Sequence, residues 1–281
     1  MKQRIITALI LAPLVIAGIF FLPIQGVAVI AAAVTLLGFW EWTQFAPLRQ
    51  YSRHYALLPA VILMVISAGV FYPGLVSGDL SVPLLILFSL ATLWWVAASA
   101  LAVTYPKTRT CWQNSTLLKQ LFGFLTLLPF MWSIIVLKAQ SSSEVSHYGA
   151  KLVLFVCLLV WAADSGAYFV GKRWGRNKMA PNVSPNKTIE GLLGGVLAAG
   201  LVGVFVSHWF ELSFSSYGHL ILTIVFTVVI SVLGDLVESM FKRNSGIKDS
   251  SQLIPGHGGV LDRIDSLTAA FPIFTLAYLV F

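Results

Sequence analysis

The sequence predicts an all-α, polytopic integral membrane protein with about nine transmembrane helices. Of its 281 residues, 58% are hydrophobic and 10% are charged, and the mean hydropathy is +0.86. A soluble domain carries about a quarter charged residues, and a globule of this size has too little interior to bury so much apolar surface. The excess apolar surface is therefore expected to face lipid.

Nine apolar runs have close to the length that a helix needs to cross the hydrocarbon core, about 20 residues. No strand-like alternation, heptad array or low-complexity linker interrupts them. The predicted spans are 5–22, 24–40, 55–72, 82–103, 121–137, 152–170, 192–210, 220–236 and 267–281.

The first run follows Lys2 and Arg4, as the apolar core of a secretory signal would. The residues at its end, LPIQ at 22–25, offer no small-residue cleavage site. We therefore expect this run to be retained as the first helix.

Nine crossings divide the connections into two alternating sets, and the cytoplasmic set should be richer in Lys and Arg. The set that contains the N-terminus holds 16 of the 18 basic residues, and the opposite set holds only Lys138 and Lys151. The 16 are Lys2, Arg4, Arg49, Arg53, Lys107, Arg109, Lys119, Lys172, Arg173, Arg176, Lys178, Lys187, Lys242, Arg243, Lys248 and Arg263. The sequence thus predicts a cytoplasmic N-terminus and a C-terminus outside.

This orientation has three further consequences. The formal charge of +7 is explained by it and does not indicate nucleic acid. Cys111 lies in a reducing cytoplasmic loop and Cys157 inside a helix, so no disulfide between them is expected. Residues 1–150 hold about five helices, and residues 151–281 hold the other helices and the polar segments, where we expect a cytoplasm-facing catalytic site.

The sixth span carries Asp164 in an otherwise apolar helix, and five basic residues follow in the next loop. A carboxylate in a membrane helix costs several kcal/mol unless it is paired or solvated, so Asp164 is a candidate functional residue. The alternative is structural: Asp164 accepts a hydrogen bond from a neighbouring Ser or Tyr and holds two helices together.

The segment SPNKTIEG at 184–191 is predicted to begin the seventh helix. Its threonine and glutamate can cap backbone N–H groups, and the same helix N-terminus attracts an anion. These residues can therefore be explained by helix capping alone, without a bound substrate. Gly191, Gly195 and Ala199 then recur at a spacing of four, which predicts a close helix-packing face.

The stretch from 234 to 266, between the last two spans, holds five of the eleven acids. Asp235 shares a helix face with Glu238 or Ser239, and Asp262 and Asp265 repeat this spacing on the next helix. Two such faces that meet in one pocket would bind a divalent ion. Carboxylate ligands in this number suit Mg²⁺, which also keeps waters and binds substrate phosphates.

Several cations lie near these acids. Lys187 and Lys248 lie in loops rich in Gly, Pro, Ser and Asn, where a cation usually has a ligand or a partner carboxylate. Lys242 and Arg243 lie nearer a helix end, and they fit equally well as positive-inside anchors at the lipid headgroups.

The remaining positions of this stretch are an arginine, three glycines and a histidine, and the arginine and the histidine each allow two interpretations. Arg263 lies between two of the acids and can pair with either, which is the structural alternative to metal binding. Gly256, Gly258 and Gly259 let the backbone approach a ligand closely. His257, flanked by two of these glycines, is either structural or a donor to a phosphate.

The segment SMFKRNSGIKDSSQLIPGHGGVLDRID at 239–265 closely resembles the signature of the phosphatidate cytidylyltransferase family, also called CDP-diacylglycerol synthases. The upstream segments WAADSGAY and SPNKTIEG also look like bacterial members, and the resemblance spans essentially the whole chain. The resemblance implies an inner-membrane enzyme, often a homodimer, that joins CTP and phosphatidic acid into CDP-diacylglycerol and pyrophosphate with Mg²⁺. The matching signature positions are Ser239, Lys242, Arg243, Lys248, Asp249, Pro255, His257, Gly258, Gly259, Asp262, Arg263 and Asp265.

The resemblance and the spacing together assign a role to each candidate, with no general base. The expected Mg²⁺ ligands are Asp235, Asp262 and Asp265, with Asp164 and Asp249 as second choices, and a second, monovalent ion stays open. The catalytic residues, which neutralise or donate to the phosphates, are Lys187, Lys248, Arg263 and His257. The expected nucleotide-binding residues are Ser184, Thr188, Lys242, Arg243, Gly258 and Gly259.

Two other functions remain as alternatives. Buried carboxylates and helices broken by Gly or Pro also mark ion-coupled transporters. Here, however, the polar residues crowd one membrane face, and no internal repeat is visible. A CTP-dependent polyprenol or other lipid kinase is the second alternative, and the resemblance alone disfavours it.

Overall fold

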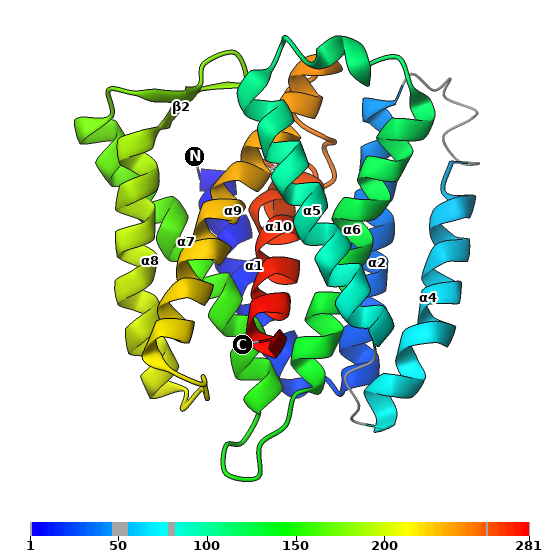
Figure 1. Cartoon of the computed structure of the whole chain (residues 1–281), viewed down its shortest axis with the longest axis vertical. Coiled ribbons are helices and arrows are strands. Elements are labelled where there is room, and N and C mark those ends of the chain that lie inside the picture. The colour runs from blue at the N-terminus through cyan, green and yellow to red at the C-terminus, as the bar shows by residue number, and fades with distance from the viewer. Residues whose placement is uncertain (1, 47–55, 78–81, 257, 281) are drawn as a thin grey trace.

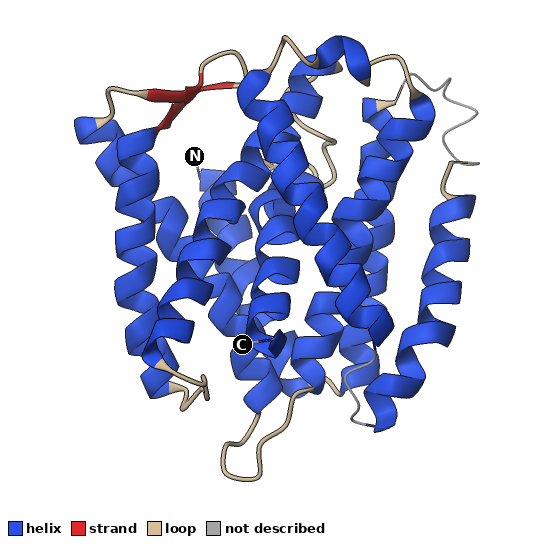
Figure 2. Ribbon diagram, viewed as in Figure 1, coloured by secondary structure: helices blue, strands red, loops and turns tan. Residues whose placement is uncertain are grey.

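The computed structural model describes residues 2–46, 56–77, 82–256 and 258–280, and within them the chain is a bundle of nine long helices (Figures 1 and 2). One short antiparallel hairpin, β1 with β2, lies over one end of the bundle. The elements are α1 (Lys2–Phe21), α2 (Ile24–Trp42), η1 (Thr43–Phe45), α4 (Leu58–Ser77), α5 (Val82–Thr104), η2 (Arg109–Cys111), α6 (Thr116–Ala139), α7 (Tyr148–Trp174), β1 (Lys178–Ala180), β2 (Ser184–Thr188), α8 (Ile189–Trp209), α9 (Tyr217–Asn244) and α10 (Leu261–Val280). The all-α prediction is confirmed.

Eight of the described helices, α2 and α4 to α10, are long and apolar enough to cross a membrane. The first predicted run corresponds to α1, in which Leu9–Phe21 forms a shorter apolar helix. The chain is thus a multi-pass membrane protein, and each predicted run coincides with one helix.

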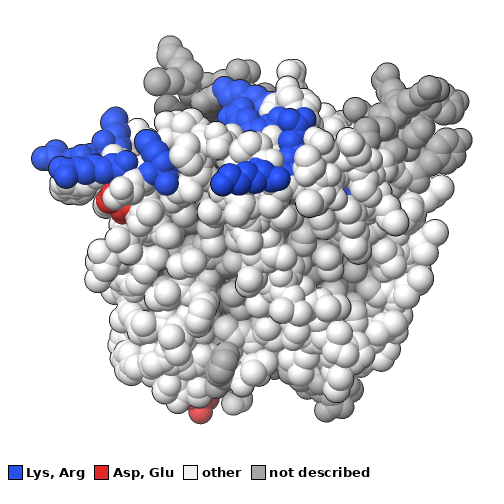
Figure 3. Space-filling model, turned by 45° about the horizontal axis from the view of Figure 1, so that its top comes forward, with Lys and Arg blue, Asp and Glu red and all other residues white. Residues whose placement is uncertain are grey.

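The helices run alternately between two ends of the bundle, and the connections divide as the sequence predicts (Figure 1). One end carries η1, η2, the β1–β2 hairpin and the loop between α9 and α10, and we call it the basic end. Figure 3 shows Lys and Arg side chains gathered there. The C-terminus lies at the opposite end (Figure 1). Which compartment the basic end faces stays a prediction.

Three helices extend past their predicted apolar runs at the basic end, α2 by only two residues and α9 and α10 by more than one turn. α2 continues to Trp42, α9 continues to Asn244, and α10 already begins at Leu261. These extensions carry charged residues, so several acids and bases of the sequence motifs lie on regular helices, whereas Lys187 lies in β2 and Lys248 and Asp249 lie in a loop.

The helices α7 and α8 pack closely together, which supports the packing-face prediction. A Cβ on Gly195 would lie 2.8 Å from the carbonyl oxygen of Ala163 in α7, and Ala199 is fully buried. On the other side of α8, Leu197 and Leu201 are 70% and 77% exposed, as expected of a lipid-facing surface. Thr188 caps this helix, since its hydroxyl accepts from the Gly191 amide at 3.1 Å.

An aromatic core beneath the basic end joins the two halves of the chain. Trp42 packs against Phe241 of α9, with ring centroids 5.0 Å apart, and Phe45 stacks on the same ring at 5.9 Å. Residues 1–150 therefore help to support the polar segments that lie in residues 151–281. Both cysteines are free, as predicted: Cys111 is exposed and Cys157 is buried.

Candidate active site

A cavity of about 360 Å³ at the basic end brings together predicted residues from three separate segments. Asp164 reaches it from α7, Lys187 and its neighbours from β2, and Asp235 from α9. The full polar lining is Asp164, Tyr168, Ser184, Asn186, Lys187, Thr188 and Asp235. The apolar helices thus place an acidic and basic site beside the lipid-facing surface.

Lys187 and Asp235 form an ion pair in this cavity. The Lys187 Nζ lies 2.6 Å from Asp235 Oδ2 and donates to the Val232 carbonyl oxygen at 3.0 Å. The other carboxylate oxygen of Asp235 accepts from the Ser239 hydroxyl, one helical turn on, at 3.2 Å. The two charged side chains keep 22% and 30% exposure, so the pair is open to a ligand.

Asp164 lies within electrostatic range of both members of this pair. Among the described residues no hydrogen bond from a Ser or Tyr hydroxyl to Asp164 is present, and the adjacent Ser165 donates to the Trp161 carbonyl oxygen. The structural alternative for Asp164, in which a hydroxyl partner holds two helices together, therefore has no support in the described part of the chain.

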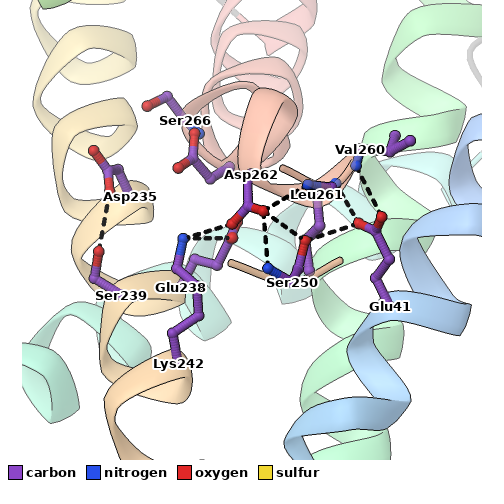
Figure 4. A network of polar contacts seen from close by, with 12 residues as sticks. Glu41, Asp235, Glu238, Ser239, Lys242, Ser250, Val260, Leu261, Asp262 and Ser266 are labelled. Carbon is purple, nitrogen blue, oxygen red and sulfur yellow. Dashed lines mark hydrogen bonds and ion pairs between the residues drawn. The ribbon is translucent and has the colours of Figure 1, made fainter. Parts of the chain in front are cut away.

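A second polar network lies deeper, between α9 and the start of α10 (Figure 4). Lys242 bridges two acids, with Nζ 3.0 Å from Glu238 Oε1 and 2.8 Å from Asp262 Oδ1. Asp262 Oδ2 accepts from the Ser250 amide and the Gly259 amide, both at 2.8 Å, and from the Ser250 hydroxyl at 3.0 Å. Asp262 therefore ties the loop between α9 and α10 to the helix that follows it.

Asp265 lies one turn further along α10. Its Oδ1 accepts from the amide of Ser266 at 2.7 Å, and the charges of Asp235, Lys242 and Lys187 lie within electrostatic range of its carboxylate. Asp235 of α9 and Asp265 of α10 thus lie within electrostatic range of each other.

Arg263 is exposed and forms an ion pair with neither Asp262 nor Asp265 in the described residues. It lines a separate polar cavity of about 510 Å³, together with Asp249 and Gly258. The pairing with Arg263, which was the structural alternative to metal binding, is therefore not observed there.

The fit of the acids to Mg²⁺ depends on which carboxylates have coordination capacity left. No group of three or more His, Cys, Asp or Glu residues in the described part of the chain is arranged to hold a metal by itself. Asp262 Oδ2 accepts from three loop donors and Oδ1 accepts from Lys242, so this carboxylate has less capacity left than the others. Asp235 and Asp265, which lie within electrostatic range of each other, fit the usual mode of Mg²⁺, in which one or two carboxylates act with substrate phosphates.

The other predicted site residues are distributed as follows. Lys248 is exposed on the loop between α9 and α10, and Arg243 donates to the Val183 carbonyl oxygen at 3.3 Å. Ser184 lines the first cavity beside Thr188, which serves as the helix cap. His257 lies outside the described residues.

The glycines of the motif lie against acids of the chain itself. Gly258 has a φ of +86°, and a Cβ there would lie 2.8 Å from Asp262 Oδ2. A Cβ on Gly259 would collide with the Ser250 hydroxyl and lie 2.5 Å from Glu41 Oε1. The close backbone approach predicted at these glycines thus has two carboxylates as its immediate partners.

Glu41, at the end of α2, is a polar residue of this region that the sequence analysis did not select. It is fully buried, and its carboxylate accepts from Ser250 and Ser251 and from the amides of Val260 and Leu261. The signal was present, because an acid inside a membrane helix is a functional candidate by default. The predicted run ended at residue 40, which placed Glu41 just outside the helix.

The similarity of this chain to known proteins extends over nearly its whole length. The profile described as "Cytidylyltransferase family" matches residues 2–281. A protein of Haemophilus influenzae named phosphatidate cytidylyltransferase is 42% identical over 286 residues, which cover 99% of this chain and 98% of that protein. Proteins of the same name from Pseudomonas aeruginosa and Bacillus subtilis are 40% and 31% identical; these matches cover 98% and 97% of this chain and 95% of each relative.

Proposed function

The chain belongs to the cytidylyltransferase family, and we propose that it transfers the cytidylyl group of CTP to phosphatidic acid, giving CDP-diacylglycerol and pyrophosphate. The observation that carries this proposal is the similarity, over nearly the full length of both chains, to relatives named phosphatidate cytidylyltransferase. The enzyme is accordingly a nucleotidyltransferase of phospholipid synthesis.

The chemistry is an in-line attack by a phosphate oxygen of phosphatidic acid on the α-phosphorus of CTP. The new P–O bond forms as the bond to the β-phosphate breaks, and pyrophosphate leaves. A phosphate monoester loses its second proton near pH about 6, so the nucleophile is largely ionised at neutral pH and needs no general base. Positioning and charge neutralisation are the main requirements of such a transfer.

The residues of the two cavities match these requirements. Lys187 lines the first cavity and keeps 22% exposure. Arg263 lines the second cavity, and the exposed Lys248 precedes Asp249, which also lines it. These cations would neutralise phosphate oxygens of the two substrates. Asp235 orients Lys187 through the 2.6 Å ion pair.

Asp235 and Asp265 would hold Mg²⁺, and Asp262 would serve the same ion less directly by fixing the start of α10. When bound, such an ion supplies charge neutralisation to the phosphates and the leaving group. The proposed setting is the bacterial inner membrane, with the basic end in the cytoplasm where CTP is present. A homodimer is the assembly that the family resemblance implies, and light scattering of the detergent-solubilised protein would test it.

The test is to incubate purified protein with labelled CTP, Mg²⁺ and phosphatidic acid or a polyprenol in mixed micelles. Label in a nucleotide-bearing lipid and release of pyrophosphate are the expected results. Phosphorylated polyprenol would instead identify a lipid kinase. Absence of any lipid product from folded protein would favour the transporter alternative.

A further inference from the structure

We infer that Glu41 of α2 is a positioning residue for the transfer reaction, because it fixes the start of α10 and the loop before it. This inference rests on the proposed function, since it concerns the same site. Glu41 comes from the N-terminal half of the chain and lies more than 200 residues from its partners along the sequence.

The burial of Glu41 is the first argument. Its exposed fraction is 0%, although an uncompensated carboxylate within a membrane helix costs several kcal/mol. A chain keeps such a group only where the surrounding donors satisfy it. The contacts of Glu41 show which part of the molecule depends on it.

Both oxygens of the Glu41 carboxylate are saturated by donors of the chain. Oε1 accepts from the Ser251 hydroxyl at 2.5 Å and from the Val260 amide at 2.9 Å. Oε2 accepts from the Ser250 hydroxyl at 3.0 Å and from the Leu261 amide at 2.6 Å. Glu41 therefore has no oxygen left for a substrate and must act through the residues that it holds.

The two amides belong to the beginning of α10, whose first residue is Leu261. The first N–H groups of a helix have no partner within the helix, and their partial positive charge attracts an anion. Glu41 satisfies two of these donors from a different helix. It thereby sets where α10 begins relative to α2.

The Ser250 hydroxyl links Glu41 to Asp262. It lies 3.0 Å from Glu41 Oε2 and 3.0 Å from Asp262 Oδ2, so its single proton is shared between two carboxylates. Figure 4 shows Ser250 between the two acids, with Lys242 on the far side of Asp262. Gln44, one turn after Glu41, also donates to the Ser250 carbonyl oxygen. The end of α2 thus holds this loop residue through both its side chain and its backbone.

The consequence for the reaction follows from the rigidity of α10. Arg263 and Asp265 lie on the first turns of this helix, directly after the amides that Glu41 holds. A shift of the helix start would move Asp265 away from Asp235 on α9. Misplacement of a reacting group by about 1 Å can lower a rate about a hundredfold.

Glu41→Gln is the main test variant, since it keeps the shape but replaces one acceptor oxygen with an NH₂ group. That group would face two donors, so two of the four hydrogen bonds would be lost. We expect kcat at saturating CTP and phosphatidic acid to fall about a hundredfold. Glu41→Asp keeps the charge on a side chain that is shorter by one methylene group. This variant should retain more activity than Glu41→Gln.

Two controls separate positioning from a general loss of stability. Phe88→Leu, in the fully buried core around Trp132, removes buried volume from α5 far from these contacts and should lower the melting temperature without changing kcat per folded molecule. Ser250→Ala removes the link to Asp262. If the two residues act in one network, the double variant should lose much less than the product of the single losses.

Hydrogen exchange at the Val260 and Leu261 amides is the readout that does not depend on activity. Faster exchange in Glu41→Gln, together with a lower kcat in folded protein, is the expected result. If the wild type is active and the folded Glu41→Gln variant shows unchanged kcat and unchanged amide exchange, the role of Glu41 is overturned while the proposed function stands. A wild type without transferase activity would overturn the proposed function and this role with it.

Discussion

Asp235 and Asp262 are both acids on membrane-spanning helices, but their partners differ. Asp235 meets one lysine beside an open cavity, whereas Asp262 has four donors, three of them from the neighbouring loop. A half-buried partner in an open cavity can be exchanged for a ligand, whereas a set of buried loop donors cannot. The same substitution should therefore have different effects at the two positions.

Asp235→Asn should lower activity by roughly a hundredfold or more while leaving the melting temperature nearly unchanged, on the scale of losing one electrostatic stabiliser. Asp262→Asn should lower activity to a similar extent and also lower the melting temperature, because buried donors lose their acceptor. Asp249→Asn should cost less than either. Activity against Mg²⁺ concentration, measured on protein with a normal size-exclusion profile, would test this. If the folded variants keep wild-type turnover and an unchanged Mg²⁺ dependence, the carboxylates have only a structural role.

Lys187→Ala should raise the apparent CTP requirement or lower turnover without impairing membrane insertion, since the cation lies in the cavity. Lys107→Ala is the matched control, because Lys107 is exposed at the same end and lines neither polar cavity. A CTP titration of both variants is the measurement. Equal behaviour of the two would mean that Lys187 is only a positive-inside anchor.

At the scale of elements, the contact between α7 and α8 positions the first cavity. Asp164 and Tyr168 lie on α7, and β2 with Lys187 leads directly into α8. The small residues of α8 let the two helices approach until a glycine of one meets the backbone of the other. The cavity therefore depends on a packing face that holds no catalytic group.

Gly195→Ala should destabilise the protein by about 1–3 kcal/mol, because the added methyl group would meet the Ala163 carbonyl oxygen at 2.8 Å. Gly200→Ala is the control on the same helix, since nothing lies within 4 Å of its added Cβ. That variant should be neutral or slightly stabilised. The measurement is the melting temperature of both variants in the same detergent. Equal values for the two variants would contradict the packing argument.

At the scale of the whole molecule, the bundle separates two surfaces of different composition. Basic side chains gather at the end that carries both polar cavities, and the C-terminus lies at the other end (Figures 1 and 3). A site that uses CTP must face the cytoplasm, where nucleotides are present. The proposed function therefore requires the basic end to lie in the cytoplasm.

A reporter that is active only outside the cytoplasm should therefore be active when fused after Phe281 and silent when fused after Lys178. The expectation follows from the 16 basic residues on one set of connections against two on the other. Enzymatic assay of the two fusions in whole cells is the measurement. The reverse pattern would contradict the orientation and with it a cytoplasmic site.

The sequence by itself determined the helical class, the order of the helices and the division of charge between the two ends. These properties depend on local hydrophobicity and on counting, which need no knowledge of which helices touch. The sequence also identified the candidate residues of the motifs, such as Lys187 and Asp235. In a chain this apolar, polar residues that solubility does not require can be recognised directly.

Only the tertiary structure decided the partners of those residues. Lys187 meets Asp235 because its side chain reaches from β2 to α9, and Asp262 accepts three hydrogen bonds from a loop that folds back onto its own helix. Glu41 was missed because the apolar run ended one residue before it, whereas the helix continues and buries it against α10. The partner of a buried charge is set by which helices pack together, and hydrophobic periodicity carries no information about that choice.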